Sequence, residues 1–399
     1  MSTIDKSSSD ACGVCGSGVA SKKNKCTTCD QIMKDGACEN NSRTTNPTSS
    51  IDTVSNGIRS MTINNDETTA KAGINCVCAF LELCVSDKLS ITSLQKTINR
   101  PGLIPINNHQ ETLFAFHHVC HNKNVTMEII ELLLEHFPDS ARVLCSEFAT
   151  SVLKHKSISK TYPLHIACCN ENCPSDVIRF LVEQYPSALG HLSNEVAGLP
   201  LHYYLARNSN VDINTVKTMV EAYPQSLMIT SGEEDEEILY PIHALLSNEW
   251  TNNIHTITIV DYLLEFNPTC LRVRDGNGHT PLHVACQSKR VNLIIVERLF
   301  NSWPEAIRII DDSGWLPVHD LCENSFIDDA VALEILQFML DADPNLPRCQ
   351  TEGGYLPIHY AVDEKSFAFC KVLIDAYPES VVMIGLNGHL PIHEARRLC

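Results

Sequence analysis

Four cysteines near the start of the chain have the spacing of a metal site. Cys12 and Cys15 form one Cys-x-x-Cys pair, and Cys26 and Cys29 form a second pair after ten intervening residues. Each pair can bring two thiolates to one tetrahedral zinc ion, and Gly13 eases the tight turn inside the first pair. We therefore predict that these four cysteines bind one structural zinc ion.

The same spacing resembles that of short zinc ribbons, in which all four cysteines ligate zinc. The resemblance covers only residues 12–29, and Asp30 stands where a glycine usually follows the fourth cysteine. Few apolar residues lie nearby to form a small core, and Cys38 is a spare thiol that would compete for the metal. The alternative interpretation of residues 1–40 is a cysteine-bearing disordered tail.

Histidines and cysteines also recur at fixed intervals along the rest of the chain. Successive histidines lie about one repeat apart, too far for two of them to share a metal with bonds near 2 Å. A cysteine comes three residues after four of them, a periodic placement typical of a small buried apolar residue and not of one activated nucleophile. The recurring histidines are His117, His165, His202, His243, His283, His319, His359 and His393, and the cysteines are Cys120, Cys168, Cys286 and Cys322.

These residues belong to a repeat that predicts two helices in each copy. A Pro-(Leu/Ile/Val)-His triplet recurs in steps of 37, 41, 40, 36, 40 and 34 residues, and its proline suits the first turn of a helix. An apolar run such as residues 177–182 then predicts a buried second helix, which a later proline ends. Since such a unit cannot bury its own apolar face, neighbouring units must stack. We predict an all-α array of seven full copies and a terminal half copy.

The copy at residues 275–286 closely resembles the ankyrin signature Gly-x-Thr-Pro-Leu-His-x-Ala. The resemblance covers residues 108–399 and implies a helix-turn-helix solenoid with short connecting hairpins, in which the motif histidine hydrogen-bonds the turn backbone. Two departures are that the motif threonine is kept only at Thr280 and that the steps exceed the usual period of about 33 residues. Upstream, we expect a disordered linker over residues 41–69 and an N-terminal cap over residues 70–107.

The position two residues before each motif proline marks the expected partner-binding surface. In ankyrin-like arrays the matching position resembles a hairpin-tip residue that points at the ligand. Aromatic side chains recur as binding anchors because they supply much contact area for little lost entropy. Here the position holds His279, Trp315, Tyr355 and His389, and we expect Asp312 and Glu352 to add an acidic rim. The alternative is that Trp315 folds back onto the neighbouring hairpin.

Charge and hydropathy restrict the partners and the compartment. Residues 70–399 hold 40 of the 48 acidic and 23 of the 30 basic residues, so their net charge is −17 and nucleic acid is not an expected ligand of the array. Residues 1–10 are polar and lack a signal-peptide core, and the apolar stretch at residues 76–85 is too short to cross a membrane. We expect a cytoplasmic or nuclear protein with reduced cysteines.

These observations favour a non-catalytic scaffold or adaptor that binds a protein partner with its concave face and hairpin tips. No phosphate-binding loop, dinucleotide fingerprint or complete catalytic constellation appears in the sequence. The alternative is a zinc-tethered regulatory adaptor, linked to the ubiquitin pathway or to transcription, whose N-terminal module recruits a second factor.

Overall fold

The computed structural model describes residues 79–100, 110–144, 161–193, 198–232 and 239–395. Regular structure in these ranges is helical, apart from an isolated β-bridge between Ser231 and Leu239 and a single bridge residue at Thr161. The predicted all-α repeat architecture is therefore confirmed for the described part of the chain. The cysteine pairs and the expected linker lie outside it.

A short first helix opens each copy, and it begins at the motif proline in every copy but the degenerate first one. The residue before the proline is extended, with ψ of 159° at Tyr162 and 162° at Thr280, because the proline ring excludes the helical region there. The first helices are α5 (Gln110–His121), α7 (Pro163–Cys169), α9 (Pro200–Arg207), α11 (Pro241–Leu246), α13 (Pro281–Gln287), α15 (Pro317–Glu323), α17 (Pro357–Glu364) and α19 (Pro391–Glu394).

The second helices carry the apolar runs seen in the sequence. In α8, the predicted buried positions Val177, Ile178, Leu181 and Val182 all face the core. Several second helices are capped at their N-termini by an Asp, Asn or Ser side chain, as Asp212 does for α10. The second helices are α6 (Met127–His136), α8 (Ser175–Gln184), α10 (Ile213–Ala222), α12 (Asn253–Phe266), α14 (Leu293–Ser302), α16 (Asp329–Ala342) and α18 (Phe367–Ala376).

An additional turn of 3-10 helix follows each second helix. Tyr223, which precedes a proline, leaves the helical region with φ −146° and ψ 77°, so α10 ends there and the proline starts the new turn. These turns of three to five residues help to explain why the repeat is longer than usual. They are η2 (Ser140–Arg142), η4 (Pro186–Gly190), η5 (Pro224–Met228), η6 (Pro268–Leu271), η7 (Pro304–Arg308), η8 (Leu346–Arg348) and η9 (Pro378–Val382).

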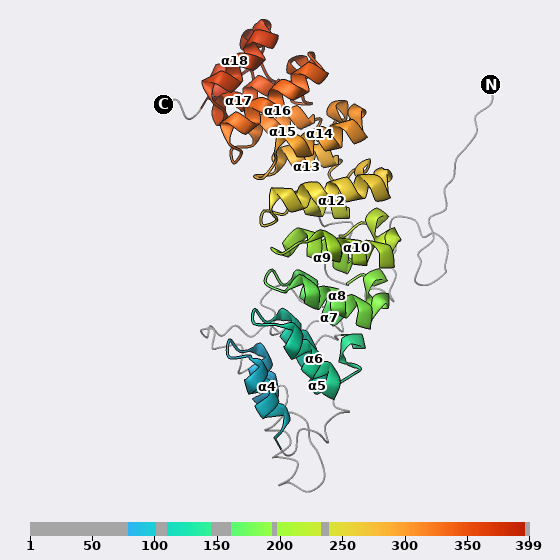
Figure 1. Cartoon of the computed structure of the whole chain (residues 1–399). Coiled ribbons are helices and arrows are strands. Elements are labelled where there is room, and N and C mark those ends of the chain that lie inside the picture. Colours follow the sequence, from blue (N-terminus) through green and yellow to red (C-terminus); the bar gives the residue numbers. More distant parts are fainter. Residues whose placement is uncertain (1–78, 101–109, 145–160, 194–197, 233–238, 396–399) are drawn as a thin grey trace, which may run out of the picture. The chain divides into compact units, whose positions relative to one another are not determined.

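Equivalent helices of successive copies pack against each other in chain order (Figure 1). First helices are in contact from α5 to α19, and second helices are in contact from α6 to α18. The apolar residues between them form one continuous buried cluster that runs from Phe80 to Leu373. Each copy therefore depends on its neighbours for burial, as expected of a repeat array.

The pattern of the copies extends into the expected cap. Residues 79–85 are helical and are followed by α4 (Ile91–Ile98), which contacts α6. The Asn122 side-chain amide donates to the carbonyl oxygens of Cys84 at 3.0 Å and Ser86 at 2.9 Å, in the same way that later copies are joined. The first described helix therefore occupies the place of a first helix in the array.

Candidate functional site

Four hairpins of the same design precede the last four first helices. They span residues 275–279, 311–315, 351–355 and 385–389, and in each the backbone N–H of the first residue donates to the carbonyl oxygen of the fifth at 2.9–3.0 Å. The fourth residue is always a glycine with φ between 71° and 78°, a conformation that other residues adopt only with strain. The fifth residue is the position that the sequence singled out, two residues before the motif proline.

The bonds that close the hairpin use the backbone of this fifth residue. The Asp275 carboxylate accepts a hydrogen bond from the His279 N–H at 2.8 Å, and the Asp311 carboxylate accepts one from the Trp315 N–H at 2.7 Å. Any side chain can therefore occupy the position without disturbing these bonds. Earlier copies place Thr161, Gly198 and Leu239 there.

Most motif histidines join their own first helix to the turn of the next copy, through Nε2 and a backbone carbonyl oxygen. In His283, Nδ1 accepts from the Thr280 N–H at 3.1 Å, so the neutral ring carries its proton on Nε2 and donates it to the Trp315 carbonyl oxygen at 3.2 Å. Burial lowers the pKa of this ring to about 4. Equivalent pairs of bonds form at His165, His202 and His319, which confirms the structural interpretation of the motif histidine.

The periodic cysteines are buried as predicted. Cys120, Cys168, Cys286 and Cys322 have no exposed surface, and burial raises the pKa of each thiol well above its usual range. Their thiolates are therefore scarce at neutral pH. Cys84 occupies the same kind of place in the first described helix and is also fully buried.

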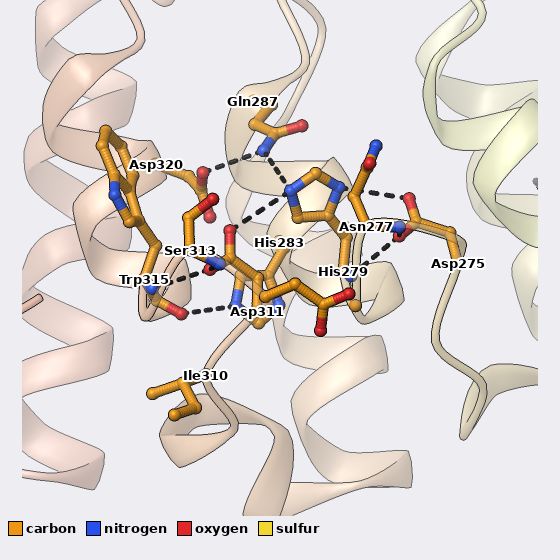
Figure 2. A network of polar contacts seen from close by, with 12 residues as sticks. Asp275, Asn277, His279, His283, Gln287, Ile310, Asp311, Ser313, Trp315 and Asp320 are labelled. Carbon is orange, nitrogen blue, oxygen red and sulfur yellow. Dashed lines mark hydrogen bonds and ion pairs between the residues drawn. The ribbon is translucent and has the colours of Figure 1, made fainter. Parts of the chain in front are cut away.

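His279 lies within a network of acidic side chains from two hairpins (Figure 2). Its Nδ1 is 3.1 Å from Asp275 Oδ2, and its Nε2 is 3.4 Å from Asp311 Oδ2. The hydrogen bond to Asp275 and the charges of the surrounding aspartates raise the pKa of His279. The structure thus engages His279 in contacts within the array and leaves 18% of its side chain exposed.

Gln287 extends this network to Asp320 on α15. The Gln287 amide donates to Asp320 Oδ1 at 2.8 Å and lies 3.5 Å from Nε2 of His279 (Figure 2). Asp320 is 4% exposed, and its Oδ2 has no hydrogen-bond partner among the described residues. Burial raises the pKa of Asp320 to about 8, so this carboxyl group is largely protonated at neutral pH.

Trp315 and Tyr355 meet through a third aromatic residue, Tyr360 on α17. The ring centroids of Trp315 and Tyr360 are 4.4 Å apart, and those of Tyr355 and Tyr360 are 5.9 Å apart. The Tyr355 ring passes so close to Gly353 and Gly385 that a Cβ on either would lie within 2.8 Å of it. Trp315, Tyr355 and Tyr360, here called the aromatic cluster, are all partly exposed.

The other predicted partner-binding residues lie outside this cluster, on the same hairpins or on neighbouring ones. Asp312 is 67% exposed and lies 3.4 Å from Arg274, while Glu352 is exposed and packs against Gly314 of the preceding hairpin. His389 is exposed in the last hairpin, where its Nδ1 is 2.9 Å from Glu394 Oε1. The hairpins thus place all six residues, but only Trp315 and Tyr355 share a cluster.

Sequence reasoning missed Tyr360 and Asp320. Both directly follow a motif histidine, so they occupy the same place on consecutive first helices. Their shared position could have drawn attention to them in the sequence. The residues after the other motif histidines are mostly aliphatic or aromatic, so a carboxyl group at this position is an exception.

The predicted zinc ligands Cys12, Cys15, Cys26 and Cys29 lie outside the described residues. Within the described ranges, no group of three His, Cys, Asp or Glu side chains is arranged to hold a metal ion. None of the helices in those ranges is both long and apolar enough to cross a membrane.

Comparison with known proteins identifies one copy directly. The ankyrin repeat family model matches residues 277–306, which run from the hairpin through α13 and α14. No curated protein matches the chain as a whole or in part. The matched copy is the one that keeps Thr280, whose hydroxyl oxygen lies 2.8 Å from Nδ1 of His283.

Proposed function

We propose that this chain, which carries an ankyrin-type helical repeat array, is a non-catalytic scaffold that binds a protein partner with the hairpins and first helices of its later copies. Stacked repeats present an extended surface that suits protein recognition, and ankyrin repeats generally mediate such interactions. The partner-binding residues of the proposal are His279, Asp312, Trp315, Glu352, Tyr355 and His389, with Tyr360 added by the structure.

The observation that carries the proposal is the aromatic cluster. The bonds that close the hairpin need only the backbone of Trp315 and Tyr355, and the corresponding places in earlier copies hold Gly198 and Thr161. The backbone bonds that close the hairpin therefore do not require two large aromatic side chains there. Partly exposed Trp and Tyr side chains are frequent anchors in protein interfaces, which supports a binding role.

The chemistry of the recurring residues favours binding over catalysis. Four of the motif histidines, among them His283, use both ring nitrogens in hydrogen bonds to backbone groups. The cysteines that follow them are buried thiols with raised pKa values, which is the opposite of an activated nucleophile. These features support a non-catalytic role.

The charge of the array supports a protein partner that is basic or mixed in charge. Residues 70–399 carry a net charge of −17, which repels phosphate backbones and attracts basic surfaces. The cysteines of the described region are unpaired, which supports a reducing compartment such as the cytoplasm or nucleus.

Affinity capture from native lysate tests this proposal when single variants of the full chain are compared. The Trp315→Ala and Tyr355→Ala variants should lose the proteins that the wild type retains, with a loss of about 2 kcal/mol or more in affinity for a hot-spot residue. Trp250→Ala is the matched control, because Trp250 is 59% exposed but lies in the turn between α11 and α12.

The melting temperature of each variant separates binding from folding. Loss of capture by Trp315→Ala at an unchanged melting temperature supports an anchor. If Trp315→Ala instead lowers the melting temperature and retains every captured protein, the aromatic cluster is structural and the proposal is wrong.

The zinc-tethered regulatory adaptor remains a second proposal, favoured by the two Cys-x-x-Cys pairs of residues 12–29. In this second proposal, a zinc site at Cys12, Cys15, Cys26 and Cys29 would recruit a second factor of the ubiquitin pathway or of transcription. The array would bind the first protein partner. Deletion of residues 1–40 separates the two proposals, because it should remove one set of captured proteins and leave the set that depends on Trp315.

A further inference from the structure

The segments that present the aromatic cluster contain acidic residues and no basic ones. Residues 309–323 and 349–364 comprise hairpins and first helices of two consecutive copies, and they include no Lys or Arg. The preceding segment, residues 272–287, differs because it includes Arg272 and Arg274. The acidic residues of the two segments are Asp311, Asp312, Asp320, Glu323, Glu352, Asp363 and Glu364.

Glu323 of this set lies close enough to Tyr360 to affect its hydroxyl group, as does Glu394 on α19. Besides burial, the charges of Glu323 and Glu394 raise the pKa of the Tyr360 hydroxyl. Partial burial of its carboxyl group and the charge of Glu364 raise the pKa of Glu323, while the residue as a whole is exposed. Glu323 is exposed, so this negative charge lies at the surface beside the aromatic rings.

The basic side chains of the flanking segments have other contacts. The Lys365 ammonium group donates to the carbonyl oxygen of Asn324. Arg308 pairs with Asp343 after α16, and Arg348 lies over the ring of Tyr377 at 4.4 Å. None of these three printed contacts is made to an acidic residue of the two segments.

We infer that the aromatic cluster receives an arginine or lysine side chain from a basic segment of the protein partner. The inference rests on the proposed function and specifies the chemistry of its ligand. Aromatic faces attract cations, and the attraction grows when carboxylates surround the same point. Trp315 and Tyr360 supply the faces, and Glu323 supplies an exposed carboxylate beside them.

A random dodecapeptide library displayed on phage, selected on the full chain, supplies the probes for a test. Selected peptides should share an Arg or Lys, and replacing it with Gln in the synthetic peptide should weaken binding at least tenfold. Binding should also weaken about as strongly in the Trp315→Ala variant and measurably in the Glu323→Gln variant. Raising the salt concentration should lower the affinity, because screening weakens the pairing.

Matched controls are Trp250→Ala and Glu334→Gln, which alter an exposed aromatic residue and an exposed acid away from the cluster. Both controls should leave peptide affinity unchanged. Peptides that depend on Trp315 but tolerate loss of their basic residue would overturn the cationic anchor and leave the proposed function intact. A selection that yields no basic peptides would also overturn the inference. Peptides that bind the Trp315→Ala variant as tightly as the wild type would overturn both the inference and the proposed binding site.

Discussion

At the scale of single residues, the motif histidine acts as a cross-link between copies. His283 accepts a hydrogen bond at the start of its own helix and donates one to the hairpin that carries Trp315. The ring is fully buried, so the two backbone groups that it satisfies have no access to water once it is removed. The same residue that sets the sequence motif therefore also positions the candidate binding residue of the next copy.

Replacing His283 with Ala should lower the free energy of unfolding by about 1–3 kcal/mol, the usual cost of leaving buried polar groups unpaired. Urea unfolding of the full chain measures this change. His255→Ala is the control, because His255 is exposed on α12 and should shift the transition little. Equal effects of the two substitutions would contradict the cross-link.

Asp320 should make stability fall as the pH rises from about 4 to 8. Its pKa is raised to about 8 in the folded chain, so between about pH 4 and 8 the folded state retains a proton that the unfolded state has released. One such proton lowers the free energy of unfolding by at most about 1.4 kcal/mol per pH unit. Below pH 6.5 the buried motif histidines oppose this trend, because their lowered pKa values make the folded state bind fewer protons.

Unfolding measured at pH 6.5, 7.5 and 8.5 isolates the contribution of Asp320. The Asp320→Asn variant keeps a partner for Gln287 but cannot ionise, so its stability should fall less over this range than that of the wild type. His279, whose raised pKa also makes stability decline with rising pH, is present in both proteins. Parallel pH profiles would show that Asp320 does not titrate as described.

The sequence predicted the role of the motif histidine but not the partner of Trp315. The histidine makes bonds to backbone atoms, which recur in successive copies, so the resemblance of the repeated motif to the ankyrin signature implies its role. The contact between Trp315 and Tyr360 joins side chains of two copies, and only these copies have aromatic residues at both places. A contact that occurs once cannot be recognised from a repeat pattern.

At the scale of elements, a ladder of asparagines joins the ends of successive first helices. Asn170 is typical, since its amide donates to the carbonyl oxygens of Cys120 at 3.0 Å and Asn122 at 3.1 Å. Its own side-chain oxygen accepts from the Asn172 N–H at 3.0 Å. Equivalent bonds form at Asn122, Asn208, Asn248 and Asn324.

The ladder is interrupted at Ser288, where substitution with Asn should stabilise the array. The backbone at Ser288 has φ −69° and ψ 138°, close to the −74° and 132° of Asn208, so an asparagine fits without strain. A small cavity lined by Asn248, Ser288 and Arg290 lies at the interruption. Two new buried hydrogen bonds should raise the free energy of unfolding by about 1 kcal/mol.

Urea unfolding of Ser288→Asn beside Ser288→Ala tests this expectation. The asparagine variant should unfold at higher urea and the alanine variant should not. A lower midpoint for Ser288→Asn would mean that the interruption is required by its surroundings, for example by the Arg290 contact with the Thr251 carbonyl oxygen.

Helix starts were easy to predict because proline fixes them. Each motif proline both suits the first helical turn and excludes the helical region for the residue before it, so two local rules agree. The first described helix, residues 79–85, was harder because it has neither the proline nor the histidine of the motif. It shares only the Ala-Phe-x-x-x-Cys pattern with residues 115–120, and its role depends on the bond from Asn122 to Cys84.

At the scale of the whole molecule, the chain combines a cysteine-rich segment with a stacked acidic array. We expect the full chain to bind about one equivalent of zinc through Cys12, Cys15, Cys26 and Cys29, and to bind it more weakly as the pH falls, because protons compete for the thiolates. Metal analysis of reduced protein from zinc-replete cells measures this. A variant with serine at the four positions should retain less than about a tenth of an equivalent, and equal zinc in both proteins would rule out this site.

The central claim is that the hairpins and first helices of the later copies hold a protein partner. Hydrogen exchange of the full chain, measured alone and in complex with a partner that depends on Trp315 for capture, tests it most directly. We expect slower exchange in residues 311–316 and 351–360 on binding. Exchange in α12 and α14, which are second helices, should not change. Protection confined to the second helices, with none at these hairpins, would contradict the account.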